Sequence, residues 1–187
     1  TDVLRLSKVM TYKSAIAKMG LGGGKSVIIA NPMKDKTPGL LKSFALVVDH
    51  LKGLYVCAED VGCTVNDAAV IRSATPYVVG LEHEKSSGNP SPYTAWGTFR
   101  SMQATCKQLF GDDSLRGKTI TIQGLGSVGH FLLDQLYWAG ATLNVYDINR
   151  EKQMRLAKKY GAKMVSKEEV LTTPCDIFSP CALGGVI

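Results

Sequence analysis

Residues 118–129 read Lys-Thr-Ile-Thr-Ile-Gln-Gly-Leu-Gly-Ser-Val-Gly, a β-branched run that leads directly into closely spaced glycines. The β-branched part predicts a buried strand over residues 118–123, and the apolar spacing that follows predicts a helix over residues 127–138. A strand, a tight turn and a helix in this order begin a βαβ unit. The sequence therefore predicts an α/β fold with a parallel sheet.

The glycines form a Gly-x-Gly-x-x-Gly pattern between the predicted strand and helix, the context in which this pattern indicates a dinucleotide site. Gly124 permits the tight turn, Gly126 lets a pyrophosphate approach the backbone, and Gly129 lets the helix lie close to the strand. Ser127 and Val128 open the helix, whose unpaired N–H groups and partial positive charge favour phosphates. The alternative is a glycine turn of another α/β protein that binds nothing.

A carboxylate stands at the end of the next predicted strand, which covers residues 141–147. Asp147 follows Gly129 by eighteen residues. A carboxylate at this place accepts hydrogen bonds from both ribose hydroxyls and repels a 2′-phosphate. The pattern therefore favours NAD over NADP.

Helical and strand-like patterns alternate along the rest of the chain. Further helices are expected over residues 2–18, 40–51, 91–110 and 151–160, and further strands over residues 26–30, 53–58, 163–165 and 176–178. The strongest loop signal is Ser86-Ser87-Gly88-Asn89-Pro90-Ser91-Pro92, which predicts a domain boundary between Gly80 and Pro90.

Composition excludes several classes of protein. The 187 residues are 45% hydrophobic and 20% charged, which is enough apolar sequence for a packed core. The net charge of +6 comes from scattered lysines and arginines rather than basic tracts, so nucleic acid is not an expected partner. No apolar run is long enough to span a bilayer, and the five cysteines and three histidines have no metal-ligand spacing. We expect no membrane partner, no metal, and free thiols in the cytoplasm.

A second glycine-rich segment, Gly20-Leu21-Gly22-Gly23-Gly24-Lys25, presents a lysine. A nucleotide-binding P-loop is excluded because Met19 stands where its first glycine is required and a strand pattern follows Lys25. Lys13 lies twelve residues earlier. Two lysines close together, or one partly buried, lower the pKa of an amine, so one of them could act as a base near neutral pH. The alternative is a pair of surface lysines.

An acidic segment, Ala58-Glu59-Asp60-Val61-Gly62, follows the strand predicted over residues 53–58. The carboxyl ends of strands are where α/β proteins place their sites. A carboxylate beside a lysine can hold the amine and relay its proton. Taken alone, Asp60 is as readily a helix cap or a surface acid.

Six segments together resemble the glutamate/leucine/phenylalanine/valine dehydrogenases in order and spacing, over essentially the whole chain, and the pattern is most similar to the leucine-specific branch. These segments are Met10–Lys13, Gly20–Lys25, Ala58–Gly62, Ser86–Ala95, Gly124–Gly129 and Pro180–Gly184. The resemblance implies NAD-dependent oxidative deamination of an L-amino acid to a 2-oxo acid and ammonia, and assembly as a homo-oligomer.

The same resemblance implies roles for individual residues. Lys25 would be the general base, Asp60 would assist proton transfer, and Lys13 would bind the substrate carboxylate. Thr94 would lie near the nicotinamide, with Cys181 and Ala182 lining the cofactor side. It also implies a partial amino-acid-binding domain with a helix-covered sheet over residues 1–80, and a Rossmann-type, doubly wound NAD-binding domain, incomplete at its carboxyl end, over residues 81–187.

Apolar residues near the implied site, Met10 and Ala58 among them, suit a branched-chain side chain better than a γ-carboxylate. Two alternatives remain open: the same chemistry on Phe or Trp, and a truncated, non-catalytic NAD-binding module. Since the chain opens in a helical pattern without Met and the family members are about twice as long, we expect a piece of a longer protein, and we do not expect this piece to be active by itself.

Overall fold

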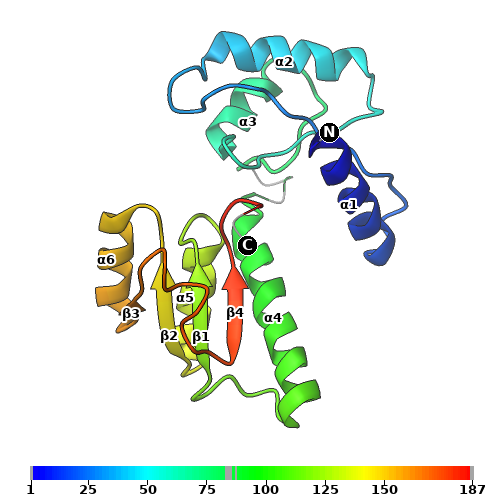
Figure 1. Ribbon diagram of the computed structural model, residues 1–187. Helices are drawn as coiled ribbons and strands as arrows, with labels where there is room; N and C mark the ends of the chain where they lie inside the picture. Colours follow the sequence, from blue (N-terminus) through cyan, green and yellow to red (C-terminus); the bar gives the residue numbers. More distant parts are fainter. Residues whose placement is uncertain (1, 83–85, 87, 186–187) are drawn as a thin grey trace. The chain divides into compact units, whose positions relative to one another are not determined.

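The computed structural model of the chain describes residues 2–82, 86 and 88–185, which divide into two compact units, Thr1–Asn89 and Pro90–Ile187 (Figure 1). Each unit has a hydrophobic core of its own. Among the residues described, no helix combines the length and the apolar character needed to cross a membrane.

The Pro90–Ile187 unit is built on a parallel sheet. Its strands are β1 (Thr119–Gln123), β2 (Thr142–Tyr146), β3 (Lys163–Met164) and β4 (Ile177–Pro180). They lie in the order β3-β2-β1-β4, and every pairing is parallel. The α/β fold with a parallel sheet that the sequence predicts is confirmed.

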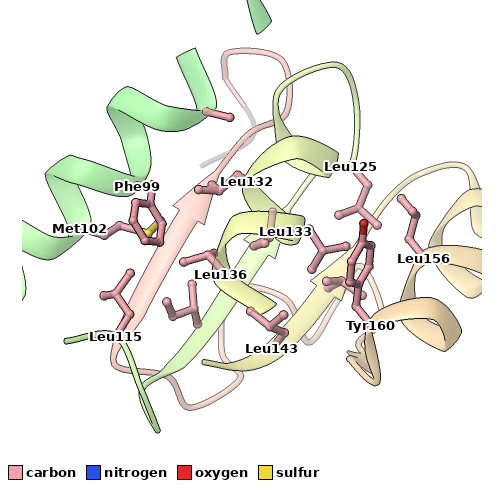
Figure 2. Close-up of a cluster of buried hydrophobic side chains, with 14 of the residues drawn as sticks. Phe99, Met102, Leu115, Leu125, Leu132, Leu133, Leu136, Leu143, Leu156 and Tyr160 are labelled. Carbon is pink, nitrogen blue, oxygen red and sulfur yellow. The ribbon is translucent and has the colours of Figure 1, made fainter. Parts of the chain in front are cut away.

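Three helices accompany this sheet in the described part of the unit: α4 (Ser91–Phe110), α5 (Gly129–Trp138) and α6 (Arg150–Tyr160). Figure 2 shows Leu132, Leu133 and Leu136 of α5 lying between the α4 side chains and Tyr160 of α6. Burial of leucine side chains stabilises the fold by about 1.5–3 kcal/mol each. This packing holds the glycine turn, which joins β1 to α5, between two buried elements.

The Thr1–Asn89 unit contains three helices among its described residues: α1 (Asp2–Ile16), α2 (Pro38–His50) and α3 (Val65–Arg72). Its core consists of buried side chains from α2 and α3 together with Cys57, Val78 and Leu81. The sequence pattern did not predict α3. The sequence signal for α3 is a capping box at its start, in which Thr64 and Asp67 each accept a hydrogen bond from the other's backbone N–H.

The prediction of two strands in this unit was wrong. Residues 26–30 have no ladder partner in the part of the unit that the structure describes, and Ile29 is 99% exposed. Residues 53–58 contribute a single parallel bridge, between Cys57 and Val78. A β-branched run becomes a strand only where a neighbouring backbone pairs with it, and local pattern carries no information about that neighbour.

The other elements agree with their predicted positions to within a few residues. The helix expected over residues 91–110 is α4, which has these bounds and Pro90 as its N-cap. α1 ends at Ile16, two residues before the predicted end.

Candidate functional site

The segment that carries Lys25 lies directly against α1. A side chain at Gly23 would overlap the Ser7 carbonyl and the Thr11 backbone, and Ser14 Oγ donates to the Gly22 carbonyl at 3.4 Å. These three α1 residues are spaced by four and three positions, so they share one helix face. Small side chains on that face and glycine in the segment allow the two backbones to touch.

An aromatic ring covers the next glycine. A Cβ at Gly24 would lie 2.6 Å from Cδ2 of Tyr55, and the Tyr55 hydroxyl lies 2.9 Å from Ser26 Oγ. Tyr55 is therefore a part of the site that no motif indicated. The only sequence signal was an aromatic residue inside the strand predicted over residues 53–58.

Lys25 forms an ion pair with Asp60, Nζ to Oδ2, across 35 residues of sequence. The Lys25 side chain is 23% exposed. Its pKa lies below the ordinary value, because partial burial disfavours the ammonium ion and the charge of Lys13 adds to that effect. The structure thus brings Lys25 together with Asp60, within reach of the field of Lys13 in the last turn of α1.

Asp60 stands on a tight turn rather than at the end of a strand. Asp60 and Cys63 exchange backbone hydrogen bonds of 3.2 and 2.8 Å, and Gly62 between them has a φ of +76°. The backbone N–H of Val61 donates to Asp60 Oδ1 at 2.8 Å, which leaves Oδ2 for Lys25. The turn therefore orients the Asp60 carboxylate toward Lys25.

The two apolar residues expected beside the substrate lie on separate elements of the same unit. Met10 is half-buried on α1, one turn before Lys13, and Ala58 is exposed two residues before Asp60.

Lys36 is a second residue that no motif indicated. Its Nζ donates to the Gly62 carbonyl at 3.2 Å and to Asp67 Oδ2 at 2.6 Å. These contacts span 26 and 31 residues of sequence, so no local pattern could have pointed to them.

In the Pro90–Ile187 unit, the glycine turn has the steric properties that its pattern predicts. Gly124 has a φ of +95°, and a Cβ there would lie 2.8 Å from the Ala182 nitrogen. A Cβ at Gly129 would overlap the Gly124 carbonyl and lie 3.3 Å from Cys181 Cβ. A Cβ at Gly126 would meet nothing within 4 Å. Two glycines thus serve close packing, while Gly126 faces open space.

Asp147 is buried beside this turn. Its Oδ2 accepts from Leu125 N–H at 2.6 Å and its Oδ1 accepts from Asn149 N–H at 2.8 Å. It also lines a cavity of about 410 Å³ at the carboxyl ends of β2 and β3. A second cavity, of about 300 Å³, is lined by Gly126, Ser127 and residues of α5 and α6.

The start of α5 is open to a ligand. Val128 is its N-cap, and no side-chain hydrogen bond caps it. Such a helix end offers N–H groups to an anion. The glycine turn leads into this helix start, and the Asp147 carboxylate is bonded to the turn through Leu125 N–H.

Thr94 lies on the first turn of α4, exposed, with its hydroxyl donating to the Pro90 carbonyl at 3.1 Å. Cys181 and Ala182 follow β4 and pack on the glycine turn. Ala182 lies against Gly124, and Cys181 lies against Gly129. Burial raises the pKa of the Cys181 thiol, so the thiol stays protonated at neutral pH.

Comparisons with known proteins agree on one family. The family model for the Glu/Leu/Phe/Val dehydrogenase dimerisation domain matches residues 1–77. Leucine dehydrogenase of Geobacillus stearothermophilus is 49% identical over 187 residues, which cover 100% of this chain and 51% of that protein. Phenylalanine dehydrogenase of Lysinibacillus sphaericus is 42% identical over 192 residues, covering 100% of this chain and 50% of that protein.

Solved structures of amino acid dehydrogenases share the fold of this chain. L-tryptophan dehydrogenase from Nostoc punctiforme matches with a TM-score of 0.72 and 39% identity, over 98% of this chain and 52% of that chain. A hetero-hexameric glutamate dehydrogenase from Thermus thermophilus shares the fold, with a TM-score of 0.76 and 21% identity, over 97% of this chain and 50% of that chain. The chain spans about half the length of the curated relatives it matches.

Proposed function

Because the chain belongs to the Glu/Leu/Phe/Val dehydrogenase family, we propose that it carries the reaction centre of an NAD-dependent L-amino acid dehydrogenase. The reaction converts an L-amino acid, NAD⁺ and water into a 2-oxo acid, ammonia, NADH and a proton. The observation that carries the proposal is the partly buried Lys25 amine, paired with Asp60 and lowered in pKa.

The residues of the glycine turn suit NAD. Gly126 leaves open space, the start of α5 is uncapped, and the Asp147 carboxylate is held by backbone donors beside the turn. Gly124, Gly126, Ser127, Val128 and Gly129 would hold the pyrophosphate. The Asp147 carboxylate would take the ribose hydroxyls and disfavour NADP.

Thr94, Cys181 and Ala182 are assigned to the nicotinamide side of the same cofactor. When bound, NAD supplies the hydride acceptor.

Lys25 has the properties of a general base. An amine substrate must lose its proton before Cα can give up hydride, and a water molecule must then be deprotonated as it attacks the resulting imine. A neutral Lys25 amine accepts the first proton, becomes neutral again when that proton passes to solvent, and then accepts the second, which is worth on the order of 10² to 10⁴ in rate when its pKa is near the working pH. Asp60 holds the amine and passes its proton toward solvent, since its side chain is 49% exposed.

Lys13 is assigned to the substrate carboxylate. It is exposed on the last turn of α1, and its charge acts on Lys25. A cation that binds the carboxylate also keeps the neighbouring amine neutral. One lysine would thus bind substrate and tune the other.

We infer a branched-chain substrate such as Leu, Val or Ile. The apolar side chains of Met10 and Ala58 offer no charge for a γ-carboxylate. The alternative is an aromatic amino acid, which the likeness to the phenylalanine and L-tryptophan dehydrogenases supports.

The domain roles are part of the proposal. Residues 1–80 would form an amino-acid-binding domain and residues 81–187 an NAD-binding domain. A homo-oligomer is also proposed. The matching family model describes a dimerisation domain, and α1 exposes apolar side chains such as Leu4 and Ile16. We place the reaction in the cytoplasm, since all five cysteines are free thiols.

The test is NADH formation by this chain and by the complete gene product, with L-Leu, L-Val, L-Ile, L-Phe, L-Trp and L-Glu as substrates. Lys25→Ala should lower kcat by about 10² or more and leave NADH binding intact. Lys8→Ala on α1 is the matched control and should keep both. Loss of NADH binding in Lys25→Ala would contradict the assignment of this residue.

A folded protein that binds NADH and turns over none of the six amino acids would favour the second candidate, a non-catalytic NAD-binding module. Lys25 and Asp60 argue against this candidate. Their ion pair lies in the Thr1–Asn89 unit, which a pure dinucleotide-binding module does not need.

A further inference from the structure

We propose that Lys36 is a positioning residue for the Asp60 carboxylate: it ties the turn that carries Asp60 to α3 and to the segment that carries Lys25. The inference rests on the proposed function, because it assigns Lys36 a task only if Lys25 and Asp60 act together.

The turn at residues 60–63 has little local support. It is closed by the Asp60–Cys63 backbone pair, and its Gly62 has a left-handed φ. Val61 at its tip is 75% exposed. A four-residue turn with an exposed tip needs contacts from elsewhere in the unit to hold one geometry.

Those contacts come from residues 32–36. The Pro32 ring lies against Gly62, where a Cβ would stand 3.4 Å from Pro32 Cβ. Lys36 Nζ donates to the Gly62 carbonyl at 3.2 Å. One end of the segment 25–36 thus bonds to the Asp60 carboxylate through Lys25, and the other end bonds to the backbone of the same turn.

The second bond of Lys36 anchors this arrangement to a helix. Asp67 Oδ2 accepts from Lys36 Nζ at 2.6 Å, from Thr64 N–H at 2.7 Å and from Thr64 Oγ1 at 2.8 Å. Burial by itself would raise the pKa of Asp67, but these hydrogen bonds outweigh it and the pKa lies below its ordinary value. Asp67 is therefore an ionised anchor at the start of α3.

The Lys36–Asp67 ion pair is more buried than an ordinary surface pair. The Lys36 and Asp67 side chains are 25% and 14% exposed, whereas in the Lys52–Asp49 pair the lysine is 71% exposed. Exposed pairs contribute little, while a partly buried cation that also bonds a backbone carbonyl holds its partners in one place.

Without Lys36, the Gly62 carbonyl loses its donor and Asp67 its counter-ion. The Asp60 turn is then free to move away from Lys25. Among the residues that the structure describes, the charged groups that act on Lys25 are Asp60 and Lys13, so a retreat of Asp60 leaves the amine with the repulsive partner alone.

The test measures the state of the Lys25 amine without requiring turnover. The complete gene product is labelled with trace acetic anhydride at a series of pH values, and mass spectrometry follows acetylation of Lys25. Loss of the paired carboxylate disfavours the ammonium ion, so Asp60→Asn should move the labelling midpoint of Lys25 to lower pH. Lys36→Gln should move it in the same direction, at least half as far.

Two variants complete the design. Lys36→Arg keeps a donor to both acceptors and should restore most of the wild-type profile. Lys52→Gln removes the exposed ion pair of the same unit and should change nothing. In turnover assays, Lys36→Gln should lower kcat about tenfold or more, with the KM for NAD unchanged.

A Lys36→Gln protein that retains the wild-type labelling midpoint and kcat would overturn the positioning role. So would faster labelling of every lysine in residues 2–82, because that pattern reports unfolding of the unit. Absence of turnover in the wild-type protein would instead count against the proposed function, and the labelling midpoints separate the two failures.

Discussion

The Lys25 amine is set between one attractive and one repulsive neighbour. Asp60 pairs with it directly, while burial and the charge of Lys13 disfavour its protonated form. Below its pKa the amine is protonated and cannot act as a base. Activity should therefore rise with pH through the pKa of Lys25.

Lys13→Gln tests this electrostatic link. Removing a nearby positive charge favours the ammonium form and raises the pKa of Lys25. The rising limb of the kcat/KM profile against pH should therefore move to higher pH. Lys8→Gln, on the same helix, is the control and should leave the limb in place. A limb that stays fixed in Lys13→Gln would show that Lys13 does not tune the base.

Asp147→Ser tests the choice of cofactor. The serine removes a buried carboxylate that would repel a 2′-phosphate, so the preference for NAD over NADP should narrow by about tenfold, equivalent to about 1.4 kcal/mol. Steady-state kinetics with both cofactors give the ratio. An unchanged ratio would contradict the role assigned to Asp147.

At the scale of elements, the glycine turn between β1 and α5 separates structural from binding requirements. Gly124 has a positive φ, and a Cβ there would overlap backbone atoms of residues 181 and 182, whereas a Cβ at Gly126 would meet nothing within 4 Å. The two positions belong to one motif, but packing requires glycine at position 124, whereas open space for a ligand is the feature of position 126.

Gly124→Ala and Gly126→Ala should therefore differ. A side chain at a left-handed position costs about 1–3 kcal/mol, and the overlap with residue 182 adds to this, so Gly124→Ala should lower the free energy of unfolding markedly. Gly126→Ala should change stability little and weaken NADH binding, because the new methyl group occupies the space open to phosphates. Denaturant titration and fluorescence titration with NADH measure the two quantities. Equal loss of stability in both variants would contradict this division.

In the segment of residues 20–26, glycine allows close packing against a helix and an aromatic ring. Gly23 touches the α1 backbone and Gly24 lies under Tyr55, so neither position has room for a side chain. The sequence interpretation attributed this glycine-rich segment to presentation of Lys25, and the contacts supply the mechanism. They fix the backbone just before the lysine.

At the scale of the whole molecule, the two units have separate cores, and we propose a separate role for each. The unit Thr1–Asn89 holds the Lys25–Asp60 pair, and the unit Pro90–Ile187 holds the glycine turn. A ligand that binds one folded unit stabilises that unit by mass action.

NADH should therefore protect the two units unequally. At a concentration a hundred times its Kd, it should stabilise the Pro90–Ile187 unit by about 2.7 kcal/mol. Hydrogen exchange followed by mass spectrometry should show slower exchange in β1, α5 and β2, and a smaller change in α2 and α3. Equal protection of both units would contradict a dinucleotide site confined to the second unit.

Local spacing was enough to predict the parallel α/β unit. The β1 strand, the glycine turn, α5 and β2 follow one another within residues 119–146, and each is specified by residues adjacent in sequence. The helices other than α3 were predicted for the same reason, since a helix satisfies its hydrogen bonds internally.

Long-range contacts decided the rest. Whether residues 26–30 form a strand depends on a partner backbone, and the pairing of Lys25 with Asp60 joins residues 35 positions apart. The bonds of Lys36 to Gly62 and Asp67 span 26 and 31 residues of sequence, and no motif indicates them. The residue types of the site could be predicted from the chain, but the contacts that hold them exist only once the two segments are packed against each other.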